Sequence, residues 1–115
     1  MITFTIYGEP VPKGRPRYGR GHVYTPRRTH EHERRIWAAA VRAGVKPTDQ
    51  PVRLSCVFCC RHPLLADVDN LAKCVMDGLA GTAYGDDRQV LELHALKVPE
   101  ATRVCTVVTV EEILA

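Results

Sequence analysis

Two pairs of aspartates in the second half of the chain have the residue types and spacing of a metal-binding site. Asp67 and Asp69 stand two positions apart, so in an extended segment their side chains point the same way. Two such carboxylates stay ionised close together only when a cation lies between them. A hard divalent cation such as Mg²⁺ takes carboxylate oxygens and keeps waters for chemistry. The pair Asp86 and Asp87 follows in a predicted turn, from which it can fold back to complete the site.

The segment after the first aspartate pair has helical spacing. Residues that recur every four positions share one face of a helix. The polar face consists of Asp69, Lys73 and Asp77, and the opposite face consists of Leu71, Val75 and Leu79. The sequence therefore predicts an amphipathic helix whose polar face continues the carboxylate pair.

The same aspartates also suit purely structural roles in helix caps and turns. Asp69 is also a good helix N-cap, and Asp86 and Asp87 suit a turn. A calcium-binding loop is excluded, because its sixth position would be Ala72 instead of Gly and its twelfth Gly78 instead of Glu. Each aspartate motif is weak alone, and the combination favours a metal site.

The cysteines predict reduced thiols in the cytoplasm. Their number, five, is odd, and three of them crowd into one apolar stretch, which does not suit a disulfide framework. Cys56 and Cys59 with His62 resemble part of a zinc site. However, the two thiols would point to opposite faces of a strand, and no second ligand pair follows.

Basic residues gather at one end of the chain. Residues 1–46 hold ten Lys or Arg against three acidic residues, a net charge of +7, whereas the remaining 69 residues carry a net charge of −4. Such an asymmetry is typical of a protein that meets a polyanion. The residues expected to contact the phosphates of such a polyanion are Lys13, Arg15, Arg17, Arg20, Arg27 and Arg28.

The elements that would position these residues follow from periodicity. Alternating apolar residues predict strands near 2–7, 52–61, 90–98 and 103–110. Residues 8–26 hold four prolines and four glycines and are expected to be irregular. Helices are expected from 25–29 to Gly44, packing through Trp37, Ala40 and Val41, and from about Asp69 to Gly81.

This order predicts an α+β fold: a small mixed sheet of about four strands with two main helices on one face, in a single domain spanning 1–115. No apolar run approaches the length of a membrane span, and no export signal is expected.

Two segments resemble the RusA family of Holliday junction resolvases, the crossover junction endodeoxyribonucleases found also in phages and prophages. They are Asp67-Val68-Asp69-Asn70-Leu71-Ala72-Lys73, followed by Gly85-Asp86-Asp87-Arg88-Gln89-Val90. The N-terminal run from Pro10 to Arg17, then Val23-Tyr24-Thr25-Pro26, is similar to phage members, so the resemblance covers nearly the whole chain.

The resemblance implies a homodimer that binds four-way DNA junctions and nicks opposing strands with Mg²⁺ or Mn²⁺, in recombination and repair. The family's metal-binding aspartates fall on Asp67, Asp69 and Asp87, and its catalytic lysine falls on Lys73. Two other hypotheses remain open: a DNA-binding module without catalysis, in which the aspartates cap a helix, and a metallohydrolase of small phosphoesters.

Overall fold

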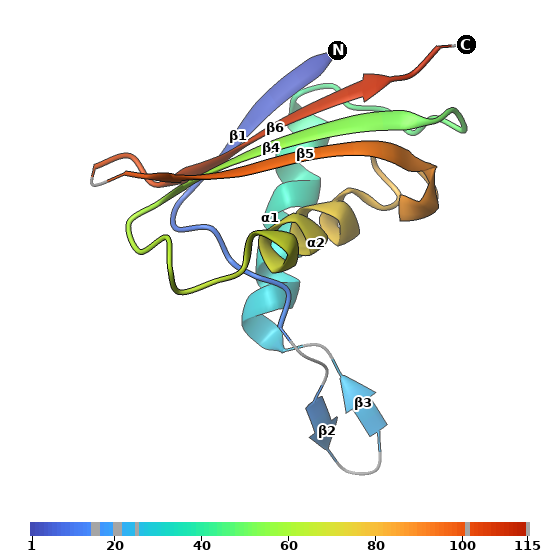
Figure 1. Cartoon of the computed structure of the whole chain (residues 1–115). Coiled ribbons are helices and arrows are strands. Elements are labelled where there is room, and N and C mark those ends of the chain that lie inside the picture. The colour runs from blue at the N-terminus through green and yellow to red at the C-terminus, as the bar shows by residue number, and fades with distance from the viewer. Residues whose placement is uncertain (15–16, 20–21, 25, 101, 115) are drawn as a thin grey trace.

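The computed structural model describes residues 1–14, 17–19, 22–24, 26–100 and 102–114, with only the backbone described for 17–19 and 22–24 (Figure 1). The elements, in chain order, are β1 (Ile2–Tyr7), β2 (Arg17–Gly19), β3 (His22–Tyr24), α1 (Arg27–Arg42), β4 (Val52–Cys60), α2 (Val68–Leu79), the 3₁₀ helix η1 (Asp87–Gln89), β5 (Val90–Pro99) and β6 (Cys105–Glu112).

Four strands form one mixed sheet in the order β1-β6-β4-β5. The neighbours β1 and β6 are antiparallel, as are β6 and β4, whereas β4 and β5 are parallel. A parallel pair needs a crossover connection, and α2 supplies it. Both helices lie on one face of the sheet (Figure 1), which confirms the predicted α+β fold.

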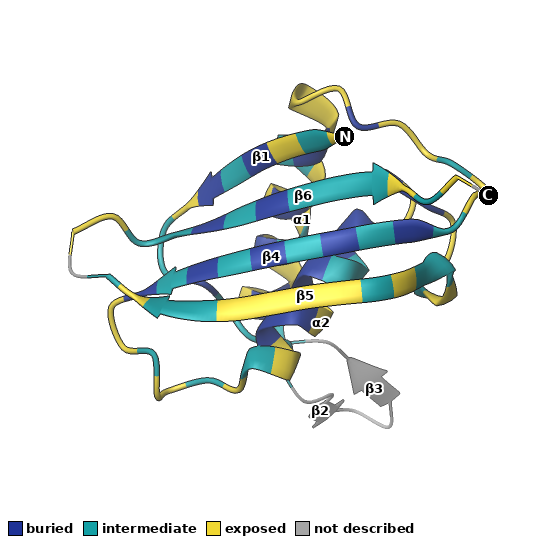
Figure 2. Cartoon of the chain, turned by 45° about the horizontal axis from the view of Figure 1, so that its top comes forward, coloured by how far each residue is buried: buried dark blue, intermediate teal, exposed yellow. Residues whose placement is uncertain are grey.

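Strand β4 shows why the sheet has a covered and an uncovered face. Its odd and even positions alternate strictly between buried and half-buried. The buried side chains belong to the hydrophobic core beneath the helices and are Val52, Leu54, Cys56, Phe58 and Cys60. The opposite face of the sheet is turned toward the viewer in Figure 2, and no helix of the described residues lies on it.

Helix α1 packs through a face that shares only Ala40 with the one predicted. Trp37 is 49% exposed and Val41 is 50% exposed, so the expectation that the Trp37 face packs is wrong. The buried face consists of Thr29, His32, Ile36 and Ala40. Ile36 contacts α2 at Gly78, where an added Cβ would lie 3.0 Å from the Ile36 Cβ. This close helix approach turns Trp37, one position further along, toward solvent.

The N-terminal connection is less irregular than expected. Strands β2 and β3 form a short antiparallel pair in which Arg17 lies opposite Tyr24. The sequence has no proline between Pro16 and Pro26, so every residue of the pair retains an amide that can join a ladder. The hairpin extends from the body of the protein near the start of α1 (Figure 1).

None of the helices in the described parts of the chain has the length and apolar character needed to cross a membrane.

Candidate active site

The loop between β4 and α2 is fixed by a lysine from the neighbouring strand. Lys97 of β5 donates from Nζ to the carbonyl oxygens of Pro63, at 2.6 Å, and Ala66, at 2.8 Å. Lys97 faces the helix side of the sheet, because it is the register partner of the buried Phe58. These bonds determine where the chain enters α2 and therefore where Asp67 lies.

The first aspartate pair lies at the start of α2 and is exposed. Asp67 is the N-cap residue by its backbone, but its side chain makes no capping hydrogen bond. Asp69 lies in the first helical turn, where its Oδ1 accepts a bond from the backbone N–H of Asn70 at 2.9 Å. Neither carboxylate therefore has the side-chain capping role that a purely structural explanation requires. Among the described residues, no cation pairs with either one.

The second aspartate pair divides its roles. Asp86 caps η1: its Oδ1 accepts from Arg88 N at 2.8 Å, and Gln89 Oε1 accepts from Asp86 N at 3.2 Å. The hydrogen bonds from Arg88, first from its backbone and then from its side chain, lower the pKa of Asp86. Gln89 Nε2 donates to Thr48 O at 2.8 Å and so ties the turn to the loop after α1. Asp87, half-buried, is left to point toward α2.

Lys73 pairs with Asp87 of the second aspartate pair and with Asp77 of its own helix. Its Nζ lies 2.8 Å from Asp87 Oδ2 and 3.1 Å from Asp77 Oδ1. The hydrogen bond to Asp87 is the largest cause of the raised pKa of Lys73, and it outweighs the opposing effect of burial. The turn at 85–89 therefore does fold back onto α2, and two predicted site residues 14 positions apart are in contact.

Lys13 occupies a different environment from the one expected of a phosphate contact. Its Nζ lies 3.0 Å from Asp77 Oδ2 and 3.2 Å from Glu33 Oε2. Burial by itself would lower the pKa of Lys13, but the bonds and charges of the two carboxylates raise it. Sequence reasoning placed Asp77 on the polar face of α2 without a role, and gave none to Glu33.

The other predicted DNA contacts are partly outside the described residues. Arg15 and Arg20 lie outside them, and only the backbone of Arg17 is described, in β2. Arg27 and Arg28 begin α1 and are exposed. Arg27 makes an ion pair with Glu31, 2.8 Å from Nε to Oε1.

The donor set suits a hard divalent cation. No group of three His, Cys, Asp or Glu side chains in the described chain is arranged as a ready metal cage. Mg²⁺ usually binds through one or two carboxylates together with waters and substrate phosphates, so a preformed cage is not required. Asp67 and Asp69 have no ion-pair partner within the described ranges, and the Asp87 carboxylate already faces a cation, the Lys73 ammonium.

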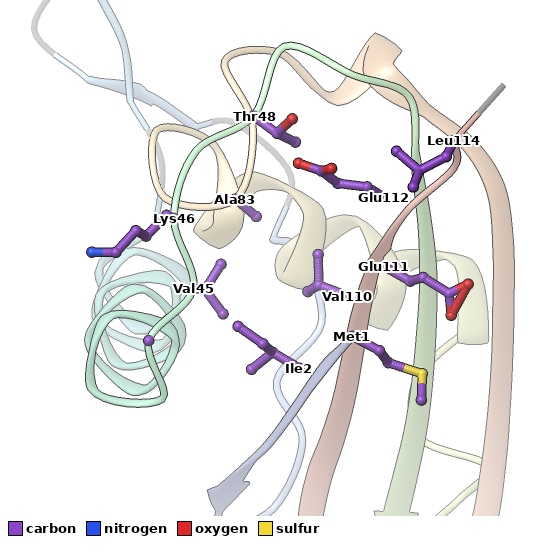
Figure 3. A pocket seen from close by; sticks show the side chains of 11 residues that line it. Met1, Ile2, Val45, Lys46, Thr48, Ala83, Val110, Glu111, Glu112 and Leu114 are labelled. Atoms are coloured by element: carbon purple, nitrogen blue, oxygen red, sulfur yellow. The ribbon is translucent and has the colours of Figure 1, made fainter.

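The cysteines and the pockets offer weaker sites. All five cysteines are free thiols; Cys56 is buried, which raises its pKa to about 12, and Cys59 lies on the opposite face beside Cys105. One pocket, with a volume of about 540 Å³, lies between the end of α1 and the ends of β1 and β6 (Figure 3). Its lining contains none of the predicted site residues.

The chain is thus a small α+β domain, a mixed sheet with two helices on one face, whose crossover helix carries acidic residues and a lysine. The sequence matches the family described as Endodeoxyribonuclease RusA over residues 7–111. The chain belongs to the RusA family of endodeoxyribonucleases, metal-dependent phosphodiester hydrolases that act on Holliday junction DNA and have resolvase activity. No protein among the curated sequences matches it.

Proposed function

We propose that the chain acts as a homodimer that nicks opposing strands of a four-way DNA junction, with Mg²⁺ or Mn²⁺ held by Asp67, Asp69 and Asp87. The contact of 2.8 Å between Lys73 and Asp87 supports this proposal best. It brings Asp87 against α2, the helix that begins with the D-x-D segment, which favours a single site built from both segments.

The side chains divide the work of phosphodiester hydrolysis. The exposed carboxylates of Asp67 and Asp69 bind the cation together with Asp87. When bound, the cation lowers the pKa of a water ligand and stabilises charge on the phosphate oxygens. The Lys73 ammonium lies beside the Asp87 carboxylate and contacts the phosphate, so that it stabilises the charge that develops in the transition state.

The basic N-terminal part of the chain supplies binding to DNA. Phosphate contacts from Lys and Arg give affinity that depends on salt and carry little sequence information. Arg27 and Arg28, exposed at the start of α1, support this assignment. Of the phosphate contacts predicted from the sequence, Lys13 pairs with Asp77 and Glu33, and the proposed contacts are the remaining five: Arg15, Arg17, Arg20, Arg27 and Arg28.

The homodimer is proposed because two symmetric nicks need two sites, and one chain offers one. A twofold axis would present identical sites to the two strands. Sedimentation at micromolar concentration is expected to give twice the mass of 12.8 kDa. A monomeric mass with intact paired nicking would contradict the dimer.

The free thiols agree with the predicted cytoplasmic location.

The test changes one carboxylate at a time, as Asp67→Asn, Asp69→Asn and Asp87→Asn. Each variant keeps the side-chain shape and removes a charge that the cation needs, so junction cleavage at saturating protein should fall by about a hundredfold or more. Junction affinity, measured by gel shift in Ca²⁺ or EDTA, should stay the same or tighten. Glu112→Gln, an exposed carboxylate of β6 at the pocket of Figure 3, is the control.

The two other hypotheses give different results in this test. A DNA-binding module without catalysis would bind junctions and leave them uncut, with binding indifferent to Asp67→Asn. A small-phosphoester hydrolase would lose activity on a small substrate in the three variants and would be indifferent to Arg15→Ala or Arg17→Ala. Normal junction cutting by folded Asp→Asn variants would contradict the metal assignment.

A further inference from the structure

Five charged side chains form a row that runs from α1 to the candidate active site. In order they are Glu33, Lys13, Asp77, Lys73 and Asp87, and acidic and basic groups alternate throughout. Asp77 is the centre of this charge row. Its Oδ2 lies 3.0 Å from Lys13 Nζ, and its Oδ1 lies 3.1 Å from Lys73 Nζ. Each carboxylate oxygen of Asp77 therefore serves a different lysine.

The backbone also holds Lys13 in this position. Its N–H donates to the carbonyl oxygen of Asn70 in α2 at 2.9 Å. The next residue, Gly14, donates from its N–H to Thr29 Oγ1 of α1 at 3.0 Å. A Cβ added at Gly14 would lie only 2.8 Å from Thr29 Oγ1 and from Pro26 Cγ. The segment that carries Lys13 is thus held between the two helices, and only glycine fits at position 14.

The exposure of the side chains separates Lys13 from an ordinary surface lysine. The side chains of Lys13 and Asp77 are each 24% exposed, and that of Glu33 is 15% exposed. An ammonium held between two carboxylates has its charge matched within the protein. It therefore has little charge left to exchange for the counterions of a phosphate backbone.

We infer that Asp77 is a positioning residue for Lys73, and that Lys13 fixes Asp77 instead of contacting DNA phosphate. The inference rests on the proposed function, in which Lys73 meets the phosphate and Asp87 binds the cation. Once Asp87 turns to the cation, Asp77 is the remaining anionic partner of Lys73 among the described residues. Asp77 then keeps the ammonium on the site face of α2, and Lys13 and Glu33 keep Asp77 in place.

The first experiment is Asp77→Asn, with kcat and KM for a labelled four-way junction measured separately. A misplaced Lys73 should lower kcat by about tenfold to a hundredfold, with KM and metal-free junction affinity unchanged within about twofold. A merely structural role would lower the melting temperature and leave the rate per folded molecule unchanged. Glu112→Gln is the control, and an unchanged kcat in Asp77→Asn would overturn the inference.

The second experiment, Lys13→Met, has a readout that needs no metal. The slope of log affinity on log salt, measured in EDTA, should be unchanged from wild type, as in Lys46→Met, an exposed lysine after α1 that serves as the control. A phosphate contact would instead reduce the slope by about one, which would overturn the role given to Lys13. Should Lys13→Met fail to fold, the double variant Lys13→Met/Glu33→Gln is measured in its place, because it also removes the Glu33 carboxylate that Lys13 pairs with.

The double variant Lys13→Met/Asp77→Asn shows whether the two residues act as one unit. Residues that work through each other give effects that do not add, so this variant should cut about as slowly as Asp77→Asn alone. Additive losses would contradict the coupling. If the wild-type protein does not cut junctions, the proposed function is wrong. If the wild type cuts and Asp77→Asn cuts equally fast, only this inference is wrong.

Discussion

The two faces of α2 are built on different principles. One face packs into the core, and its residues Leu71, Cys74, Val75 and Leu79 are at most 1% exposed. The other face carries Asp69, Lys73 and Asp77, which hydrogen-bond or ion-pair with neighbours in reach of solvent. Each buried Leu or Val contributes about 1.5–3 kcal/mol by leaving water, whereas an exposed ion pair contributes about 0–1 kcal/mol.

This difference suggests that the helix separates support from chemistry. Hydrophobic packing fixes where the polar face lies, so the charged residues can be selected for what they do to a cation and a phosphate. Changes on the buried face should then alter stability without altering the rate per folded molecule. Changes on the polar face should alter the rate without altering stability.

The largest effect on stability is expected from Leu79→Ala. Leu79 is fully buried at the end of α2, so truncation leaves a cavity and should cost about 2–5 kcal/mol in the free energy of unfolding. Urea denaturation measures this loss, and Leu64→Ala, at a side chain 95% exposed, is the control. Junction cleavage per folded molecule should match wild type. A slowed rate in fully folded Leu79→Ala would break the division between the two faces.

Lys73→Met should give the opposite result. The side chain is 48% exposed, so losing its ion pairs should change the free energy of unfolding by less than about 1 kcal/mol. The loss of an ammonium beside the reacting phosphate should lower the cleavage rate by about a hundredfold. Quenched single-turnover assays measure the cleavage rate, and thermal melting measures the stability. A variant that cuts normally would remove Lys73 from the chemistry.

His32 tests the division with a polar group on the buried side of α1. Burial first, then the charges of Arg35 and Arg28, lower the pKa of His32 from 6.5 to about 4. Between these values the unfolded chain binds a proton that the folded chain does not, so stability should fall as the pH drops from 6.5 toward 4. His32→Leu should lessen this dependence in melting curves, and His30→Leu, an exposed neighbour, should retain it.

The smallest effect is expected from Gly78→Ala, where α1 and α2 approach most closely. A Cβ there would lie 3.0 Å from the carbonyl oxygen of Glu33 and from Ile36 Cβ. Overpacking costs about 1–3 kcal/mol, and the better helix propensity of Ala offsets about 1 kcal/mol. A net loss of about 1 kcal/mol is expected in urea denaturation. Gly85→Ala, with room for a Cβ, is the control, and a stabilised Gly78→Ala would show that the helices can move apart.

Local patterns in the sequence predicted the strands and the second helix well. The alternation of apolar residues in β4 and the apolar stripe on α2 are periodic patterns, and the structure buries the same residues that these patterns predict. The packing face of α1 was not predictable in this way. Both Trp37 and Ile36 are apolar and adjacent in sequence, and the choice between them depends on where Gly78 lets α2 approach. The approach of the two helices depends on tertiary packing, which no local sequence pattern indicates.

The candidate site shows the same limit. The spacing of Asp67, Asp69 and Lys73 predicts a shared site, and the structure places Asp87 against Lys73. The contact from Lys13 to Asp77 joins segments far apart in the sequence, so the spacing of residues could not predict it. For Asp86 the sequence predicted a turn, and the capping of η1 by its side chain became visible only in the structure.

The position of β6 constrains the order in which the sheet can be completed. It is the last strand in the sequence, yet it lies between β1 and β4 and pairs with both. The hydroxyls of Thr3 and Thr109, 106 residues apart, lie 2.9 Å from each other across β1 and β6. During synthesis, the first strand must wait for the last before it finds a partner, and such non-local pairing is intrinsically slow. A nascent chain that lacks β6 presents two unpaired strand edges, the condition that favours aggregation and chaperone binding.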